Sequence, residues 1–146
     1  MKRLNCTIFL FFFSVLLLYA QKKGTEQWVK ISDDEIVTIY YNTKIITNRS
    51  GNHIVWVKAV YHDLEWQRYF ANQIGSRTLV TTTKTKAMFS DRYTHVMVRQ
   101  VMCYSKAGKL LYNSSDDTSA GWGVVNAADP VGIVGEFFMD KYNNMY

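Results

Sequence analysis

The chain has 146 residues, a formal net charge of +5 and 48% hydrophobic residues. This length fits one domain and excludes an enzyme that carries a separate cofactor domain. Aromatic residues make up 15% of the chain and proline occurs once, which argues against disorder and favours a compact domain rich in strands.

The first twenty residues have the pattern of a secretory signal peptide. Lys2 and Arg3 form a basic start, Ile8–Leu18 is apolar apart from one serine, and Ala20 is a small residue at a plausible cleavage point. A retained membrane anchor is the alternative, but the apolar stretch is shorter than the roughly 20 residues that a span needs. We therefore expect an exported protein, in the periplasm, on the outer surface or secreted.

Cleavage after residue 20 leaves a polar tether at 21–27 and one domain at 28–146. The loss of the two basic residues Lys2 and Arg3 lowers the net charge from +5 to +3. A charge of this size attracts acidic partners only weakly over long distances.

One cysteine, Cys103, follows the predicted leader. Exported proteins meet an oxidising environment in which disulfides are normal, but a single thiol cannot form an internal bridge. The apolar run around Cys103 favours a buried free thiol that packs as a small hydrophobic side chain. An intermolecular disulfide or a reactive thiol is the alternative.

Strand patterns dominate the first half of the domain. Gln27–Ile31 predicts a short strand, and Ile36–Asn48 is rich in β-branched and aromatic residues. The turn-forming sequence Arg-Ser-Gly-Asn at 49–52 separates this segment from a second strong strand pattern, His53–Tyr61. We expect 36–48 and 53–61 to form an antiparallel hairpin.

Asp63–Gly75 has the pattern of a short helix, with Asp63 as its N-cap and Gly75 at its end. Apolar residues recur in it at helical spacing: Trp66, Tyr69, Phe70 and Ile74. Arg77–Phe89 alternates Thr and Lys, which predicts a largely exposed strand or the arm of a hairpin.

Tyr93–Ser105 predicts a further strand. Its larger apolar side chains are expected on one face: Val96, Val98, Met102 and Tyr104. Ala107 and Gly108 turn the chain into a short strand at Lys109–Asn113, and Ser114–Gly121 is a polar loop.

A C-terminal helix is predicted from Asp129, a good N-cap, and Pro130, which suits the first helical position. An apolar stripe follows: Val131, Val134, Phe138 and Tyr142. Gly132 and Gly135 each cost about 1 kcal/mol relative to alanine in a helix, so close approach to a sheet must offset them. The predicted fold is α+β, an antiparallel β-sheet of five to six strands with a C-terminal α-helix packed on one face.

Several short motifs occur in a familiar order. They are Trp28-Val29, Thr38–Asn42, Val55–Lys58, Tyr104–Lys109, and Trp122 followed by Asp129–Glu136. In this order and spacing the chain, from Trp28 to Tyr142, resembles the surface-adhesin protein E family.

The resemblance implies a small antiparallel sheet with a C-terminal helix and a cell-envelope setting in Gram-negative bacteria. The member that gave the family its name is an adhesin that binds host extracellular-matrix proteins. This chain lacks the cysteine pair of many members, and no lipid-attachment cysteine follows the leader.

Patterns for nucleophilic catalysis are absent from the sequence. The nearest combination is Cys103 with His95, but eight residues of extended strand separate them by about 26 Å. No Gly-x-Ser-x-Gly motif is present. Paired carboxylates could serve a glycosidase. Asp33-Asp34-Glu35 and Asp116-Asp117 have the pattern of solvated loops, and Asp63 and Glu65 fit the start of a helix.

Metal and phosphate motifs are also missing. Nothing has the spacing of Cys-x-x-Cys or His-Glu-x-x-His, and His53 and His62 are expected on opposite faces of one strand. Gly121-Trp122-Gly123 lacks the lysine and the helix of a phosphate loop. We therefore predict no catalytic residue, no metal and no cofactor.

Four basic residues lie close together in the sequence: Arg77, Lys84, Lys86 and Arg92. One interpretation is an exposed strand that lysine and threonine keep soluble. The other is a binding face for an acidic partner, such as a matrix protein, a glycan or an anionic envelope surface. Nucleic acid is disfavoured by export.

The sequence thus favours a non-enzymatic, adhesin-like binding module, exported and without a membrane span in its mature chain, that binds protein or glycan. The alternative is a periplasmic structural or assembly component that acts as a homodimer through Trp66 and Tyr69 or through an edge strand. A small hydrolase would require a deep pocket that gathers His62, Asp63 and Glu65.

Overall fold

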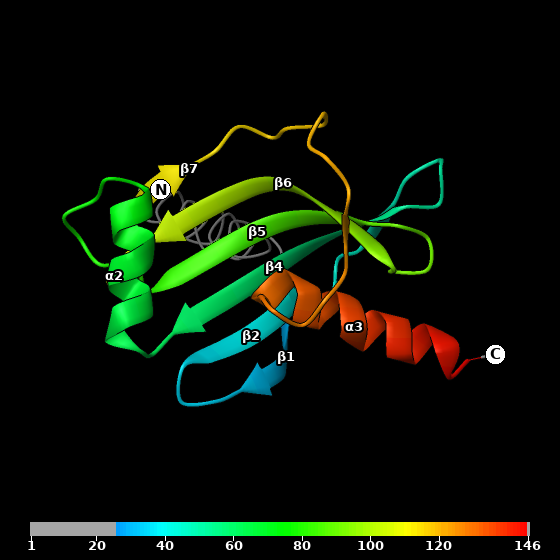
Figure 1. Ribbon diagram of the computed structural model, residues 1–146, viewed down its shortest axis with the longest axis horizontal. Helices are drawn as coiled ribbons and strands as arrows, with labels where there is room; N and C mark the ends of the chain where they lie inside the picture. The colour runs from blue at the N-terminus through cyan, green and yellow to red at the C-terminus, as the bar shows by residue number, and fades with distance from the viewer. Residues whose placement is uncertain (1–25, 146) are drawn as a thin grey trace, which may run out of the picture.

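The computed structural model describes residues 26–145, which form one antiparallel sheet with two helices on it (Figure 1). The strands are β1 (Trp28–Asp33), β2 (Val37–Asn42), β3 (Ile46–Thr47), β4 (His53–Tyr61), β5 (Thr82–Phe89), β6 (His95–Tyr104), β7 (Leu110–Asn113) and β8 (Gly123–Val124). The helices are α2 (Leu64–Gln73) and α3 (Pro130–Asn143). The predicted leader lies outside the described residues.

The main path through the sheet runs β1-β2-β4-β5-β6-β7, while β3 pairs with β4 and β8 pairs with β6. Every pairing is antiparallel. The predicted α+β class and the C-terminal helix are confirmed. The predicted count of five to six strands is too low, because the described sheet has eight strands.

One of the additional strands arises from a break in the predicted strand 36–48. The Asn42 side chain accepts a hydrogen bond from the backbone N–H of Lys44 (2.8 Å), and the N–H of Thr43 bonds to the carbonyl of Gln27 (2.9 Å). The Asn42 bond is local and competes with the strand conformation, while the Thr43 bond continues the pairing with the chain before β1. Pairing with β4 therefore stops after Tyr41 and resumes at β3.

The core lies between the sheet and α3, which crosses one sheet face (Figure 1). The buried residues of this cluster are Ile39, Val55, Val57, Ala87, Phe89, Tyr93, Val125, Val131, Val134 and Phe138. A smaller cluster lies beside α2 and is built on Ala71, Val80 and Cys103. In the main cluster strand residues two apart in sequence share the covered face, and in the smaller cluster Cys103 shares it with the partly buried Val101.

The prediction of a largely exposed strand over Arg77–Phe89 is wrong, although its hairpin pairing with the next strand is confirmed. β5 lies between β4 and β6 in the sheet, and its alternate residues Thr83, Thr85, Ala87 and Phe89 are buried. A threonine presents a methyl group that packs well on a pleated, half-buried surface. The Thr-Lys alternation therefore belongs to a central strand with one covered face.

The expectation that one face of β6 carries four apolar residues is also wrong. Val96 and Val98 are opposite Phe89 and Ala87 of β5, whereas Met102 is opposite Lys84. A β-bulge at Arg99, between these two sets, places an extra residue in β6 and exchanges the faces of the following side chains.

Both predicted helix caps are confirmed. The Asp63 carboxylate accepts hydrogen bonds from the N–H groups of Glu65 (2.9 Å) and Trp66 (3.0 Å) at the start of α2. Gly75 follows that helix with φ +66°, a conformation that suits glycine. At α3, Asp129 accepts from the N–H of Gly132 (2.8 Å).

The two glycines of α3 let this helix approach its neighbours closely. A Cβ atom on Gly132 would overlap the backbone carbonyl of Asn126. A Cβ on Gly135 would lie 2.7 Å from Val125 Cγ1 and 2.9 Å from Phe89 Cε1. The packing of α3 on the sheet thus requires both positions to lack a side chain.

We predict that Gly132→Ala lowers the free energy of unfolding by about 3 kcal/mol, because the added methyl group forces α3 away from Asn126. Gly121→Ala is the control, since a Cβ there has no atom within 4 Å and should change the stability by less than about 0.5 kcal/mol. Urea unfolding of the purified proteins measures both. Equal stabilities of the two variants would contradict the close approach.

Candidate functional site

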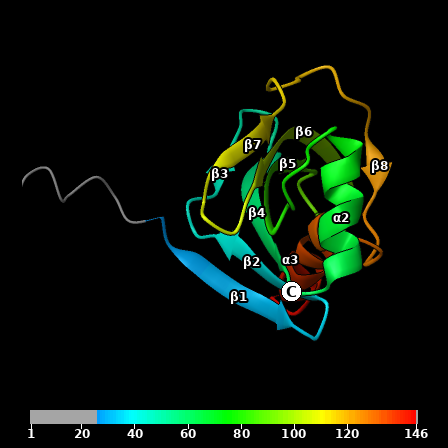
Figure 2. The same cartoon turned by 90° about the vertical axis from the view of Figure 1, so that its left-hand side faces the viewer.

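Both helices lie on the same side of the sheet, and the edge strands β1 and β7 bend away from them (Figure 2). We call the opposite side the open face, since no helix of residues 26–145 covers it. Its half-buried side chains alternate with the core residues and include Trp28, Tyr40, Trp56, Lys58, Lys84, Lys86, Met102 and Tyr104.

The strand register places two lysines side by side at the centre of the open face. Tyr40 of β2 is opposite Lys58 of β4, and Lys58 is opposite Lys84 of β5. Neighbouring strands are only about 4.8 Å apart, so the two ammonium groups share one small region. Like charges at this spacing repel each other, which requires compensation from their surroundings.

Aromatic rings supply part of that compensation. The Lys58 ammonium lies 4.2 Å from the ring centre of Tyr40 and 4.8 Å from that of Trp28. The Lys84 ammonium lies 5.3 Å from the ring centre of Trp28 and 5.7 Å from that of Tyr104. Each ammonium is thus within cation–π distance of two rings, which hold the cations over the sheet.

The carboxylate of Glu26 completes this cluster. Its Oε2 atom lies 2.8 Å from Lys84 Nζ and accepts a hydrogen bond from Trp28 Nε1 at 3.1 Å. The hydrogen bond from Lys84 lowers the pKa of Glu26 below its usual value. Glu26 is therefore ionised on the open face at neutral pH.

Lys58 has a different environment. Within residues 26–145 no carboxylate lies within 4.0 Å of its ammonium group. Partial burial lowers the pKa of Lys58, the Lys84 ammonium lowers it further, and Glu26 opposes both effects. The aromatic rings attract the Lys58 ammonium, but no carboxylate of residues 26–145 forms an ion pair with it, so its positive charge is not neutralised.

A hollow of about 570 Å³ adjoins the cluster where β2 breaks from the sheet. Its lining residues are Glu26, Gln27, Asn42, Thr43, Lys44, Ile46 and Trp56. The hollow is polar at Glu26 and Lys44 and apolar at Trp56 and Ile46, a combination typical of surfaces that recognise a ligand.

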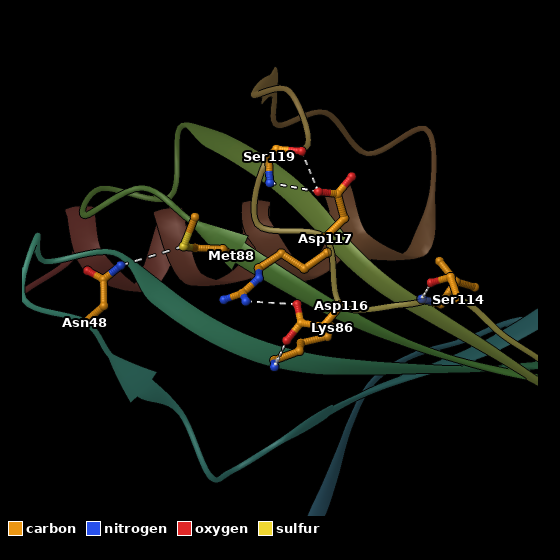
Figure 3. A network of polar contacts seen from close by, with 9 residues as sticks. Asn48, Lys86, Met88, Ser114, Asp116, Asp117 and Ser119 are labelled. Atoms are coloured by element: carbon orange, nitrogen blue, oxygen red, sulfur yellow. Dashed lines mark hydrogen bonds and ion pairs between the residues drawn. The ribbon is translucent and has the colours of Figure 1, made fainter.

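A second ionic cluster lies beside the first. Asp116, in the loop after β7, binds Lys86 Nζ at 2.6 Å and Arg99 Nη2 at 2.9 Å, and Figure 3 shows Lys86 and Asp116 in contact. Arg99 is the bulge residue of β6, so the bulge directs its guanidinium to the same carboxylate. The hydrogen bond from Lys86 is the main cause of the lowered pKa of Asp116.

The four basic residues predicted as a partner-binding group do not form one cluster. Lys84 and Lys86 share the open face, but Arg77 lies in the loop before β5 and Arg92 lies in the turn after it. The whole of β5 lies between the two arginines in the chain, and an eight-residue strand spans about 26 Å. The sequence interpretation also missed Lys58, Trp28 and Tyr40, because their nearness to Lys84 depends on strand pairing.

The predicted burial of Cys103 is confirmed, and the thiol is free. Burial raises its pKa, which disfavours the reactive thiolate. Two of the three histidines contact side chains that are distant in the sequence: His62 Nε2 is 2.7 Å from Thr38 Oγ1, and the His53 ring stacks on Tyr93 with ring centres 4.7 Å apart.

The carboxylates of the loops hold backbone turns. Asp34 accepts from the N–H groups of Ile36 and Val37, and Asp117 accepts from the N–H and the hydroxyl of Ser119, as Figure 3 shows. Among residues 26–145 no group of three or more His, Cys, Asp or Glu side chains could hold a metal ion. No helix in this part of the chain is long and apolar enough to cross a membrane.

Comparison of the chain with protein-family models gave no match. Searches of curated proteins and of solved structures also gave none. The resemblance to the surface-adhesin protein E family therefore rests on the sequence motifs alone.

We predict that Asp116→Asn lowers the free energy of unfolding by about 1–2 kcal/mol near neutral pH, because Arg99 loses its partner while it is only 13% exposed. Since the folded-state pKa of Asp116 is lowered, the carboxylate stabilises the fold above its unfolded pKa, about 3.9, and this stabilisation is lost as the pH falls through the folded value. Urea unfolding at about pH 7 and at a series of lower pH values should show the difference from wild type shrinking as the pH falls.

Glu35→Gln is the matched control for that prediction. Glu35 is exposed in the turn between β1 and β2, and the substitution removes one negative charge without breaking an ion pair. Its stability should stay within about 0.5 kcal/mol of wild type. A loss equal to that of Asp116→Asn would indicate a general charge effect.

Proposed function

We propose that this protein is a non-enzymatic, exported binding module of the cell envelope, adhesin-like in role, that binds an acidic protein or glycan partner through the open face. The observation that carries the proposal is the pair Lys58 and Lys84, two cations on adjacent strands within a ring of aromatic side chains. One of these cations has no carboxylate partner within residues 26–145.

The physical properties of this face suit binding. Its side chains project from the central strands of a hydrogen-bonded sheet, so little order has to be created when a partner binds. Trp28 and Tyr40 offer large contact areas with few rotatable bonds. An acidic partner would match the unpaired charge of Lys58, which favours both selectivity and fast association.

Three further points support the proposal. The predicted leader indicates export, and the order of motifs from Trp28 to Tyr142 resembles a family with a cell-envelope adhesin. The raised pKa of Cys103 favours a packing role for that thiol over nucleophilic chemistry.

The test compares two double variants that remove the same charge. Lys58→Gln with Lys84→Gln should weaken retention on acidic matrix proteins or glycans at least tenfold. Arg77→Gln with Arg92→Gln should reduce it less than threefold, because these arginines lie beyond opposite ends of β5 and contribute only long-range attraction. Bound protein is quantified on an array of immobilised matrix proteins and acidic glycans.

Either of two results would contradict the proposal. Equal losses in the two double variants would show that only net charge matters. Absence of the protein from the envelope and medium fractions of whole cells, together with no retained partner on the array, would remove the basis for an exported binding module.

A second candidate function is a homodimeric assembly component, which α2 favours. Trp66 and Tyr69 are 45% and 50% exposed, and their rings touch each other and Phe70. An exposed aromatic cluster of this kind is typical of a protein interface.

If α2 forms such an interface, Trp66→Ser with Tyr69→Ser should convert a dimer to a monomer. Sedimentation velocity over a hundredfold range of concentration measures the change. A wild-type protein that remains monomeric over this range would contradict the hypothesis of a homodimer.

A further inference from the structure

We infer that Lys84, Lys58 and the indole N–H of Trp28 form a carboxylate-binding site, that Glu26 occupies this site within the chain, and that an acidic segment of a partner protein displaces Glu26 on binding. The inference rests on the proposed function of the open face and adds to it the class of partner and an internal competitor.

The geometry around Glu26 is that of a carboxylate receptor. One carboxylate oxygen receives both the Lys84 ammonium, at 2.8 Å, and the Trp28 indole N–H, at 3.1 Å. An ammonium and an indole can only donate hydrogen bonds, so both groups require an acceptor, and the positive charge of the ammonium favours a carboxylate over a neutral oxygen. The Trp28 ring at the same time lies within 4.8 Å of the Lys58 ammonium.

Glu26 can leave the site at low cost. It precedes β1, its side chain is 58% exposed, and it belongs to neither core cluster. Exposed ion pairs of this kind contribute little to stability. A ligand that brings its own carboxylate can therefore replace Glu26 without disturbing the packing of the sheet.

The site has positive charge left over when Glu26 is bound. Lys58 is adjacent to Lys84 across β4 and β5, and no carboxylate within residues 26–145 pairs with it. A partner with two neighbouring acidic groups would satisfy both lysines, whereas Glu26 satisfies one. This difference gives the partner an advantage over the internal carboxylate.

The contacts on this face favour a polypeptide as the partner. Three carboxylates pair with lysines of the open face among the described residues: Glu26 with Lys84, Asp116 with Lys86, and Asp33 with Lys30. Glu26 and Asp116 lie on non-helical chain outside the strands, so irregular polypeptide already presents acidic side chains to this face. The hollow lined by Trp56, Ile46 and Lys44 begins at Glu26. The partner residues on either side of an incoming acidic side chain can lie in this hollow.

The experiment measures binding of a fluorescein-labelled peptide of Gly-Glu-Glu repeats to the purified protein by fluorescence anisotropy. Glu26→Gln should bind the peptide about three- to tenfold more tightly than wild type, because an internal competitor that fills a site most of the time lowers its apparent affinity by that factor. Glu35→Gln removes the same charge from an exposed turn and should leave the affinity unchanged.

Lys84→Gln should weaken binding of the peptide at least tenfold, and Lys106→Gln, at an exposed turn position, should weaken it less than twofold. A peptide of Gly-Gln-Gln repeats should not bind. Circular dichroism of each variant verifies that it is folded.

The results separate this inference from the proposed function. If the lysine variants reduce partner retention but Glu26→Gln binds the peptide no better than wild type, the internal competitor is refuted and the binding module stands. If the protein binds polygalacturonate or heparin and not the Glu peptide, the assignment of a polypeptide partner is refuted. If Lys58→Gln with Lys84→Gln changes nothing, the proposed function fails as well.

Discussion

The strict alternation of side chains along β4 and β5 is the constraint on which the rest of the structure depends. Val55, Val57 and Ala59 point into the core beneath the helices, so the residues between them must face the other way. Because β4 and β5 are central and pair in register over eight residue pairs, the lysines and aromatics of the open face are brought into rows. The core and the candidate binding face are therefore two consequences of one strand register.

Each face of the sheet contains an energetically unfavourable feature that neighbouring contacts offset. On the covered face, α3 gives up helix propensity at two positions: Gly132 lies close to the backbone of Asn126, and Gly135 lies close to Val125 and Phe89. On the open face, two ammonium groups are held side by side, and aromatic rings with the Glu26 carboxylate offset their repulsion. We interpret the second arrangement as functional because its lysines, Trp28 and Glu26 belong to neither core cluster, whereas the two like charges repel each other.

Local chemistry explains which expectations were met. Asp63, Asp129 and the turn at 49–52 act through bonds to residues a few positions away, so their roles were predictable from the chain order alone. The bulge at Arg99 was not predictable, because the extra residue is defined only against its partner strand. The central position of β5 was missed for a similar reason: alternating Thr and Lys describe a half-covered strand at a sheet edge and at its centre equally well.

The sequence by itself determined the α+β class, the two capped helices, the buried Cys103 and the presence of lysines on one face of a strand. These features depend on periodicity and capping within short segments. Only the tertiary structure decided that Lys84 belongs with Lys58, Trp28 and Glu26 instead of with Arg77 and Arg92. The physical reason is that neighbours across a sheet are set by strand order and register, which join residues far apart in the chain.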